Sequence, residues 1–226
     1  EKARSAGAPG GGAARMASVA AAGGAEEQLG RQQEAQSLQE LWASAYEGWV
    51  APPGAETGEV VYLRPIAAGE AALGECGAAS GWLQATLAAM DKNGGVFGIT
   101  AFNPMGQDKP HKENLANNQR LEEELKRLCA ETPGGMYWRS FGFAAQWHEK
   151  GFTVAAPQDK MVELAKKFNQ GAIYRFYPSP GGVAPIMRAT VPAALADTEA
   201  DVPVAPCGAP AGLPRAAPDW EPPAEG

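Results

Sequence analysis

The stretch GVFGITAFNPMGQDKPHKENLANNQ (residues 95–119) carries the clearest information about the fold. Its first part, residues 96–102, is apolar at nearly every position, so both faces of this strand must be covered. A central strand between helices, or one deep in a two-layer sandwich, has this pattern. An Asn-Pro pair ends the strand, and a helix that contains several Asn residues follows the polar loop.

Outward from this stretch, predicted strands and helices alternate between residues 59 and 178. In chain order they are strand VVYLRP, helix GWLQATLAAM, strand VFGITAF, helix KENLANNQRLEEELKRLCAE, strands MYWRSFGFAA and GFTVAA as a hairpin, helix QDKMVELAKKFN and strand AIYRFY. This order predicts an α/β fold, an α+β sandwich whose mixed sheet has about five strands and whose core contains about three helices.

The composition divides the chain into four segments. Residues 1–25 are rich in Ala and Gly and form an expected extended arm, and residues 26–50 show helical spacing of apolar residues, which predicts an amphipathic helix. Residues 59–178 form the expected small α/β domain. Residues 179–226 contain ten of the 19 prolines, a density that predicts a second extended arm.

The first segment contains Lys2, Arg4 and Arg15 and has no acidic residue between Glu1 and Glu26. This composition is typical of an organelle-targeting peptide or of the remnant that cleavage leaves. A flexible linker is the alternative reading, and the sequence leaves both open.

Charge and cysteine content exclude several classes of function. The central residues 59–178 carry thirteen basic and thirteen acidic side chains, so no basic surface for nucleic acid is expected. Cys76, Cys129 and Cys207 are far apart and show no metal-ligand spacing, which favours reduced thiols and predicts neither a metal nor a cofactor. No apolar run is long enough for a membrane-spanning helix.

Polar residues beyond the apolar strand are candidates for a ligand site. Asn103 lies at the carboxyl end of that strand, the position where open α/β sheets bind their ligands. Asn118 falls near the inward face of the following helix, and a buried amide needs hydrogen-bonding partners. A structural role, in which these amides bind the backbone of the turn, is the favoured alternative. The full candidate set is Asn103, Asn114, Asn118, Glu149 and Gln170.

Four segments together resemble a known protein family: ITAFNPMG, ENLANNQRLEEEL, WHEKGFTV and MVELAKKFNQGAIYRF. The chain is similar over about residues 59–178 to the largely bacterial family called domain of unknown function 3293. The matching positions are Thr100, Asn103, Pro104, Glu113, Asn114, Glu149, Gly151, Phe152, Ala165, Phe168, Gln170, Ala172 and Ile173. The resemblance supports the expected domain and implies no activity, substrate or cofactor. The helix before Glu59 and the two arms depart from the family pattern.

Two hypotheses of function follow. The favoured one is a non-catalytic accessory or structural subunit of a large organellar assembly, because arms that fill nearly half of the chain suit a peripheral subunit that contacts protein neighbours. The composition favours a chloroplast over a mitochondrion, and a photosynthetic membrane complex to which the subunit is peripheral. The alternative is a small enzyme or ligand-binding module with its site at the end of the strand formed by residues 96–102.

Three tryptophans are the expected contacts with partner subunits. Trp42 and Trp49 lie on the apolar stripe of the predicted amphipathic helix, for which packing on the domain's own core is the favoured reading and contact with a partner the alternative. Trp220 is the last aromatic residue and stands in the proline-rich arm. Tryptophan is enriched at interface hot spots, which predicts that Trp220 inserts into a pocket of a neighbouring subunit.

Overall fold

The computed structural model describes residues 40–56, 58–66, 83, 86–88, 90–92, 94–145, 147–179, 186–196 and 200–211. The chain divides into two units, Glu1–Glu40 and Leu41–Gly226. Every described residue except Glu40 belongs to the second unit. The predicted arm at residues 1–25, most of the predicted helix at residues 26–50, and Trp220 lie outside the described residues.

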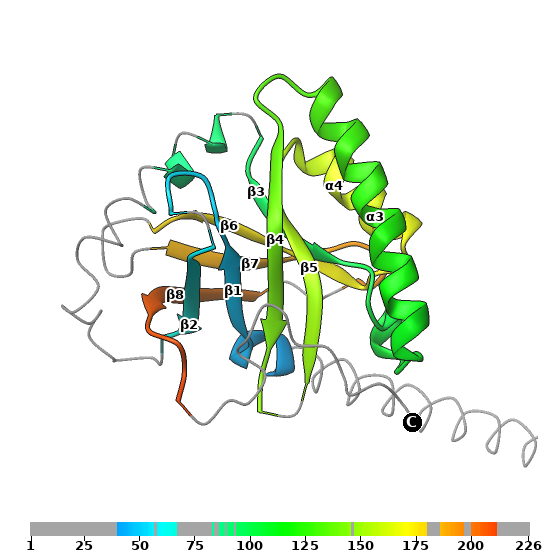
Figure 1. Cartoon of the computed structure of the whole chain (residues 1–226), viewed down its shortest axis with the longest axis horizontal. Coiled ribbons are helices and arrows are strands. Elements are labelled where there is room, and N and C mark those ends of the chain that lie inside the picture. Colours follow the sequence, from blue (N-terminus) through cyan, green and yellow to red (C-terminus); the bar gives the residue numbers. More distant parts are fainter. Residues whose placement is uncertain are drawn as a thin grey trace, which may run out of the picture. The chain divides into compact units, whose positions relative to one another are not determined.

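The second unit is built on a closed barrel of eight antiparallel strands, in the order β1-β2-β8-β7-β6-β3-β5-β4 with β4 pairing back to β1 (Figure 1). Closure leaves no strand with an unpaired edge. The strands are β1 (Tyr46–Val50), β2 (Val60–Pro65), β3 (Val96–Thr100), β4 (Met136–Phe143), β5 (His148–Ala155), β6 (Ala172–Pro178), β7 (Ile186–Pro192) and β8 (Ala200–Cys207).

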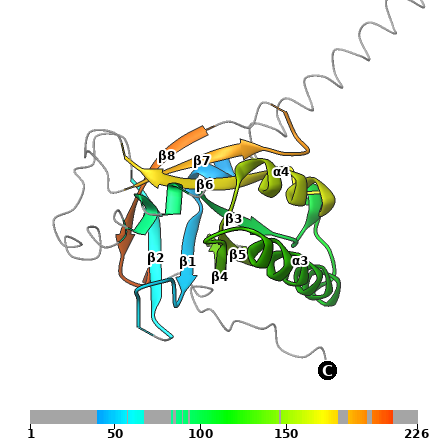
Figure 2. The ribbon, with the colours of Figure 1, turned by 90° about the horizontal axis from the view of Figure 1, so that it is seen from above.

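Two helices lie against the outside of the barrel. Helix α3 (His111–Glu131) contacts β4 and β5, and helix α4 (Gln158–Lys167) contacts β3 and β6. Figure 2 shows both helices on the same side of the strands. A short 3₁₀ helix, η2 (Pro104–Gly106), lies in the loop between β3 and α3.

Strand alternation places successive side chains in two separate cores. On β3, Phe97 and Ile99 face outward and pack with Leu121 and Leu125 of α3. Val96 faces inward and belongs to the interior cluster of the barrel. The strand is therefore apolar on both faces because one face lines the barrel interior and the other is covered by helices.

The interior cluster fills the end of the barrel at which β3 begins. Its members come from all eight strands and from the helical residues that precede β3. They are Trp49, Leu63, Leu83, Leu87, Met90, Val96, Trp138, Ala155, Phe176, Ile186 and Val204. Toward the other end of the barrel, where β3 ends, the inward positions are small or polar. The candidate site lies at this end.

The predicted α/β sandwich with a mixed sheet of about five strands and three core helices is wrong, because the structure is a closed antiparallel barrel with few helices. The predicted hairpin is present as β4 and β5, and the strand at residues 96–102 is present as β3. The missed strands are β1, in the predicted amphipathic helix, and β7 and β8, in the predicted proline-rich arm. Five residues are too few to separate helical spacing from strand alternation, and β8 keeps its pairing despite Pro203 and Pro206.

We expect Gly151→Ala to destabilise the barrel by about 2 kcal/mol, because the added methyl group would force the paired strands β3 and β5 apart. A Cβ on Gly151 would stand 2.5 Å from the carbonyl oxygen of Ile99 on the paired strand β3. Urea unfolding measures the change. Gly208→Ala is the matched control, since a Cβ there meets no atom within 4 Å, and it should change the free energy of unfolding by under about 0.5 kcal/mol. Equal stability of the two variants would contradict the close packing of β3 on β5.

Candidate ligand site at one end of the barrel

The loop after β3 has an unusual backbone that begins at Asn103. Asn103 (φ 43°) and Met105 (φ 55°) both adopt left-handed conformations. Asparagine tolerates this region better than other residues that carry a Cβ, whereas methionine does not. The amide N–H of Met105 donates to the carbonyl of Asn169, which ties the loop to the end of α4 (3.1 Å). Strained backbone of this kind persists where surrounding contacts hold it, and it is frequent at functional sites.

Asn103 and Asn114 hold this loop through a reciprocal pair of bonds. The backbone N–H of Asn103 donates to Oδ1 of Asn114 at 2.9 Å, and Nδ2 of Asn114 donates to Oδ1 of Asn103 at 2.8 Å. Oδ1 of Asn103 also accepts from the N–H of Lys109 at 3.1 Å. The two side chains thereby fix both ends of the loop between β3 and α3.

Asn118 and Gln170 bind the backbone just before Asn103. Oδ1 of Asn118 accepts from the N–H of Ala101 at 3.2 Å, and Nε2 of Gln170 donates to the carbonyl of Phe102 at 3.1 Å. Both side chains are buried. Their contacts with the main chain agree with a structural role, so these two members of the candidate set position the loop.

Glu149 connects the amide network to the barrel interior. Nδ2 of Asn103 donates to Oε1 of Glu149 at 3.0 Å, so all five candidate residues lie around one turn of chain. Burial raises the pKa of Glu149 to about 7. The hydrogen bond from Asn103 lowers this pKa, and the nearby carboxylate of Asp108 raises it.

A second carboxyl group, Glu47 on β1, faces the same end of the interior. Glu47 pairs with Gly142 on β4, and Gly142 pairs with Glu149 on β5, so the three residues form one row across three strands. Side chains in one row point to the same face, here the interior. A Cβ on Gly142 would stand 3.6 Å from Oε1 of Glu47. The absence of a Cβ at Gly142 leaves room for the side chains that lie beside it, Glu47 and Trp147.

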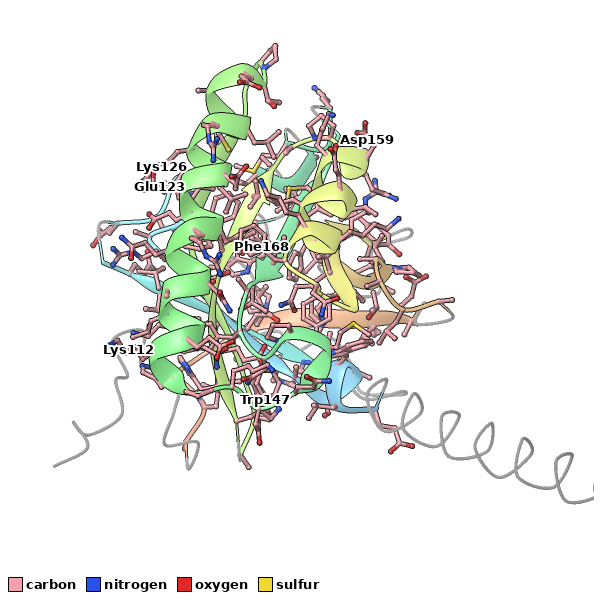
Figure 3. All side chains as sticks on the ribbon, turned by 90° about the vertical axis from the view of Figure 1, so that its right-hand side faces the viewer. Lys112, Glu123, Lys126, Trp147, Asp159 and Phe168 are labelled. Atoms are coloured by element: carbon pink, nitrogen blue, oxygen red, sulfur yellow. The ribbon has the colours of Figure 1, made fainter. Side chains whose placement is uncertain are left out.

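Trp147 borders the same space. Its ring would lie 3.2 Å from a Cβ on Gly142. Figure 3 shows Trp147 at the end of the unit where Lys112 marks the first turn of α3. The aromatic ring therefore stands at the end of the barrel that also carries the amide network.

Arg188 on β7 is the buried cation of the site. Its Nη1 donates to the carbonyl of Ala45 at 2.7 Å, and its Nη2 donates to the carbonyls of Trp42 at 2.7 Å and Ala43 at 3.1 Å. The guanidinium carbon lies 4.6 Å from the ring centroid of Tyr174. These contacts bind the chain before β1 to the barrel.

Glu47 is poorly paired for a buried carboxyl group. Its side chain is 5% exposed, its Oε1 lies 3.9 Å from Nη1 of Arg188, and among the described residues this oxygen accepts no hydrogen bond. Burial raises the pKa of Glu47 to about 8, Arg188 lowers it in part, and the Glu149 carboxylate raises it again. Desolvation outweighs the distant guanidinium, so Glu47 is largely protonated at neutral pH.

Further polar atoms in the interior also find no hydrogen-bond partner among the described residues. They are Oγ1 of Thr153 and the indole nitrogens of Trp49 and Trp138. All three belong to inward positions of β5, β1 and β4. Such buried atoms in a native protein usually meet water or a ligand.

Two of the three tryptophans predicted as partner contacts, Trp42 and Trp49, lie among the described residues, and their surroundings differ. Trp49 is 1% exposed and packs edge-on against Trp138 and Phe176 inside the barrel, so its side chain contacts its own domain. Trp42 is partly buried, and its carbonyl accepts bonds from Arg188 and from the hydroxyl of Tyr174.

Sequence reasoning missed Glu47, Arg188 and Tyr174 as site residues. Glu47 and Arg188 stand in segments that were assigned to a helix and to an extended arm, where charged side chains are expected in solvent. The alternation of Glu47 with Trp49 was the available signal, because residues two apart share one face of a strand.

Among the described residues, no group of three or more His, Cys, Asp or Glu side chains is arranged to hold a metal ion. Within the same part of the chain, no helix combines the length and the apolar character that a bilayer crossing requires.

We expect Asn103→Ala to destabilise the protein by about 2 kcal/mol, because three side-chain hydrogen bonds are lost around a strained turn. The pKa of Glu149 should rise, since the bond that lowers it disappears. Urea unfolding and carboxyl-carbon NMR titration measure the two effects. Asn117→Ala on α3, whose side chain accepts only from Arg120 in the described structure, is the control and should leave both quantities nearly unchanged. An unchanged Glu149 titration in Asn103→Ala would contradict the network.

The two carboxyl groups also predict how stability depends on pH. The folded-state pKa of Glu47 is about 8 against an ordinary value of 4.5, so between these values the folded protein binds more protons than the unfolded chain. The free energy of unfolding should therefore fall as pH rises through this window, by up to about 1.4 kcal/mol per pH unit. Glu149 should also lower the free energy of unfolding as pH rises between 4.5 and about 7.

Glu47→Gln should remove its share of this dependence. The slope between pH 5 and 7 should roughly halve, and the fall between pH 7 and 8 should vanish, because glutamine does not titrate. Urea unfolding from pH 5 to 9 provides the comparison. Glu163→Gln, whose side chain is 73% exposed, should follow the wild-type profile. A profile that is the same for Glu47→Gln and the wild type would show that Glu47 is not buried as described.

Residues 99–173 match the family model described as "Protein of unknown function (DUF3293)". No curated protein and no solved structure matches the chain significantly. The matched segment contains Asn103, Asn114, Glu149 and Gln170, whereas Glu47 and Arg188 lie outside it.

Proposed function

Residues 99–173 are a DUF3293 domain, and from this premise we propose that the protein binds a small polar molecule inside the barrel, between Glu47 and Glu149. An eight-stranded barrel is just wide enough to fill with side chains or to hold one small ligand. Here the interior is apolar at one end and polar at the other.

The observation that carries the proposal is the row Glu47, Gly142, Glu149. The outer two Cα atoms are separated by two strand spacings, roughly 10 Å. A small group bound between the two carboxyls, beside the ring of Trp147, would contact Glu47 on one side and Glu149 on the other. A buried carboxyl group, Glu47, with a second, partly buried one, Glu149, two strands away costs stability, and proteins keep such costs chiefly where function requires them.

The surroundings of the row support ligand binding over simple packing. The amide network fixes Glu149 from outside, and the bonds of Arg188 fix the chain that leads to Glu47. Both carboxyl groups are thereby held on strands by a supporting shell of hydrogen bonds, which is how preorganised sites are built. Their pKa values near neutrality also suit proton exchange with the bound molecule.

The hypothesis of a structural subunit in a chloroplast assembly stays a prediction. Its premise of a long carboxyl-terminal arm is wrong for β7 and β8, which are barrel strands. Its remaining support, the segment at residues 1–25 and Trp220, lies outside the described residues.

A ligand screen tests the proposal. The full chain is mixed with pools of amino acids, amines, sugars, carboxylic acids and nucleosides, and ligand-observed NMR detects binding and any chemical conversion. We expect bound molecules to lose at least tenfold in affinity in Gly142→Leu, because the added side chain fills the space beside Glu47 and Trp147.

Two further variants separate a blocked site from a damaged fold. Gly208→Leu adds the same side chain in open space and should bind like the wild type. Glu47→Gln keeps the size of the side chain and should weaken binding while the methyl spectrum of the barrel is preserved. The proposal is wrong if no pool contains a ligand, or if the ligands found bind equally well to Gly142→Leu and Glu47→Gln.

A further inference from the structure

We propose, on the basis of the function above, that the ligand is a small organic monocation whose ammonium or guanidinium group lies between Glu47 and Glu149. The inference rests on the charges that face this end of the interior, on the bonds already made by Arg188, and on the ring of Trp147. Each is a separate observation.

The charges around the row do not balance when both carboxyls are ionised. The titratable and charged side chains that face it are Glu47 from β1, Glu149 from β5, Tyr174 from β6, Arg188 from β7 and, from the loop before α3, Asp108. On β5, the neighbours His148 and Lys150 occupy the outward register. Above about pH 8, where both carboxyl groups are ionised, two interior carboxylates meet one interior cation, and a bound monovalent cation restores the balance.

Arg188 is already committed to other acceptors. Its Nη1 and Nη2 donate to three backbone carbonyls between 2.7 and 3.1 Å, while its approach to Glu47 is 3.9 Å. Glu149 receives a bond from the neutral amide of Asn103. Neither carboxyl group therefore receives a charged hydrogen bond within 3.5 Å from the described residues, which is the contact that a bound ammonium or guanidinium supplies.

Trp147 makes the same place favourable for a cation. The point beside Gly142 that lies 3.6 Å from Oε1 of Glu47 lies 3.2 Å from the indole ring of Trp147. A positive group bound near Gly142 would have the Glu47 carboxylate and the rim of the Trp147 indole as neighbours, and a tryptophan ring attracts cations at its face. An anion would meet two carboxyl groups at this place.

Binding of a cation should depend on pH, because it favours the ionised carboxylates. Below about pH 8 Glu47 is protonated in the free protein, and below about pH 7 Glu149 is as well. Protons must then leave when the cation enters. Affinity should rise roughly tenfold per pH unit for each proton released, and it should level off above pH 8. Guanidinium stays charged throughout this range.

The experiment compares molecules of equal shape and different charge on the full chain. Butylguanidinium is titrated against butylurea, and butylammonium against 1-butanol, with pentanoate as the anion. Chemical shifts of the Gly142 and Gly151 amides report binding at pH 6, 7, 8 and 9. We expect each cation to bind at least tenfold more tightly than its neutral counterpart at pH 8, and butylguanidinium to lose at least tenfold between pH 8 and 6.

Variants connect the selectivity to the residues. Glu47→Gln and Glu149→Gln should each weaken butylguanidinium binding at least tenfold at pH 8 and flatten the pH dependence, whereas the exposed Glu163→Gln should change neither. Equal or tighter binding of butylurea or pentanoate, or an affinity for the cations that is independent of pH, would overturn the cationic ligand. If the screen has found a neutral or anionic ligand that Gly142→Leu excludes, the proposed function survives that result. If nothing binds in either experiment, both proposals fail.

Discussion

The pairing of β1 with both β2 and β4 is the constraint on which the structure depends, because it closes the barrel. Closure gives every strand one inward face, and strict alternation then sends Glu47 and Trp49 into the same interior. An open sheet would have left Glu47 free to turn toward solvent. The buried carboxyl group is thus a consequence of closure, and Gly142 on the neighbouring strand adds no side chain of its own beside it.

Burial of Glu47 and Glu149 raises the pKa of both groups, and the surrounding hydrogen bonds compensate only in part. Asn103 donates to Glu149, but it also holds the loop with Asn114, so the same amide stabilises the carboxylate and the strained turn. Arg188 lowers the pKa of Glu47 from a distance while its hydrogen bonds go to the chain before β1. Neither carboxyl group forms a close ion pair in this arrangement. Both can therefore still accept a charged hydrogen bond, as the carboxyl groups of a binding site do.

The sequence predicted those features that rest on long or strongly patterned segments. Helices α3 and α4, the hairpin of β4 and β5, and the apolar strand β3 each carry a clear period or turn signal. Asn103 and the four polar residues around it were predicted as a site because Asn103 directly follows the strongly apolar strand β3. Strand β1 was missed because its five residues fit the helical period as well as the strand period, and β8 because its proline-rich segment was predicted to be an extended arm.

The topology of the missed strands was beyond sequence reasoning for a physical reason. Pairing of β1 with β4, and of β2 with β8, joins segments that are about 90 and 140 residues apart. Neither hydrophobic periodicity nor secondary-structure propensity indicates which distant segment a strand pairs with. Without these pairs, Glu47 and Arg188 read as surface charges. Their burial follows from closure alone, so the carboxyl pair emerged only with the fold.

The boundary of the family match explains why the site needs more than the DUF3293 domain. Residues 99–173 contain β4 and β5 completely and β3 and β6 in part, in the spatial order β6-β3-β5-β4. Such a sheet has two open edges, which are a liability for aggregation, and its concave face cannot exclude water. The strands β1, β2, β7 and β8 cover both edges and complete the ring. Glu149 comes from the matched segment and Glu47 from the added strands, so the two carboxyl groups meet across the β4 edge where the two parts join. The pairing of β1 with β4 that closes the barrel therefore also brings Glu47 to the site.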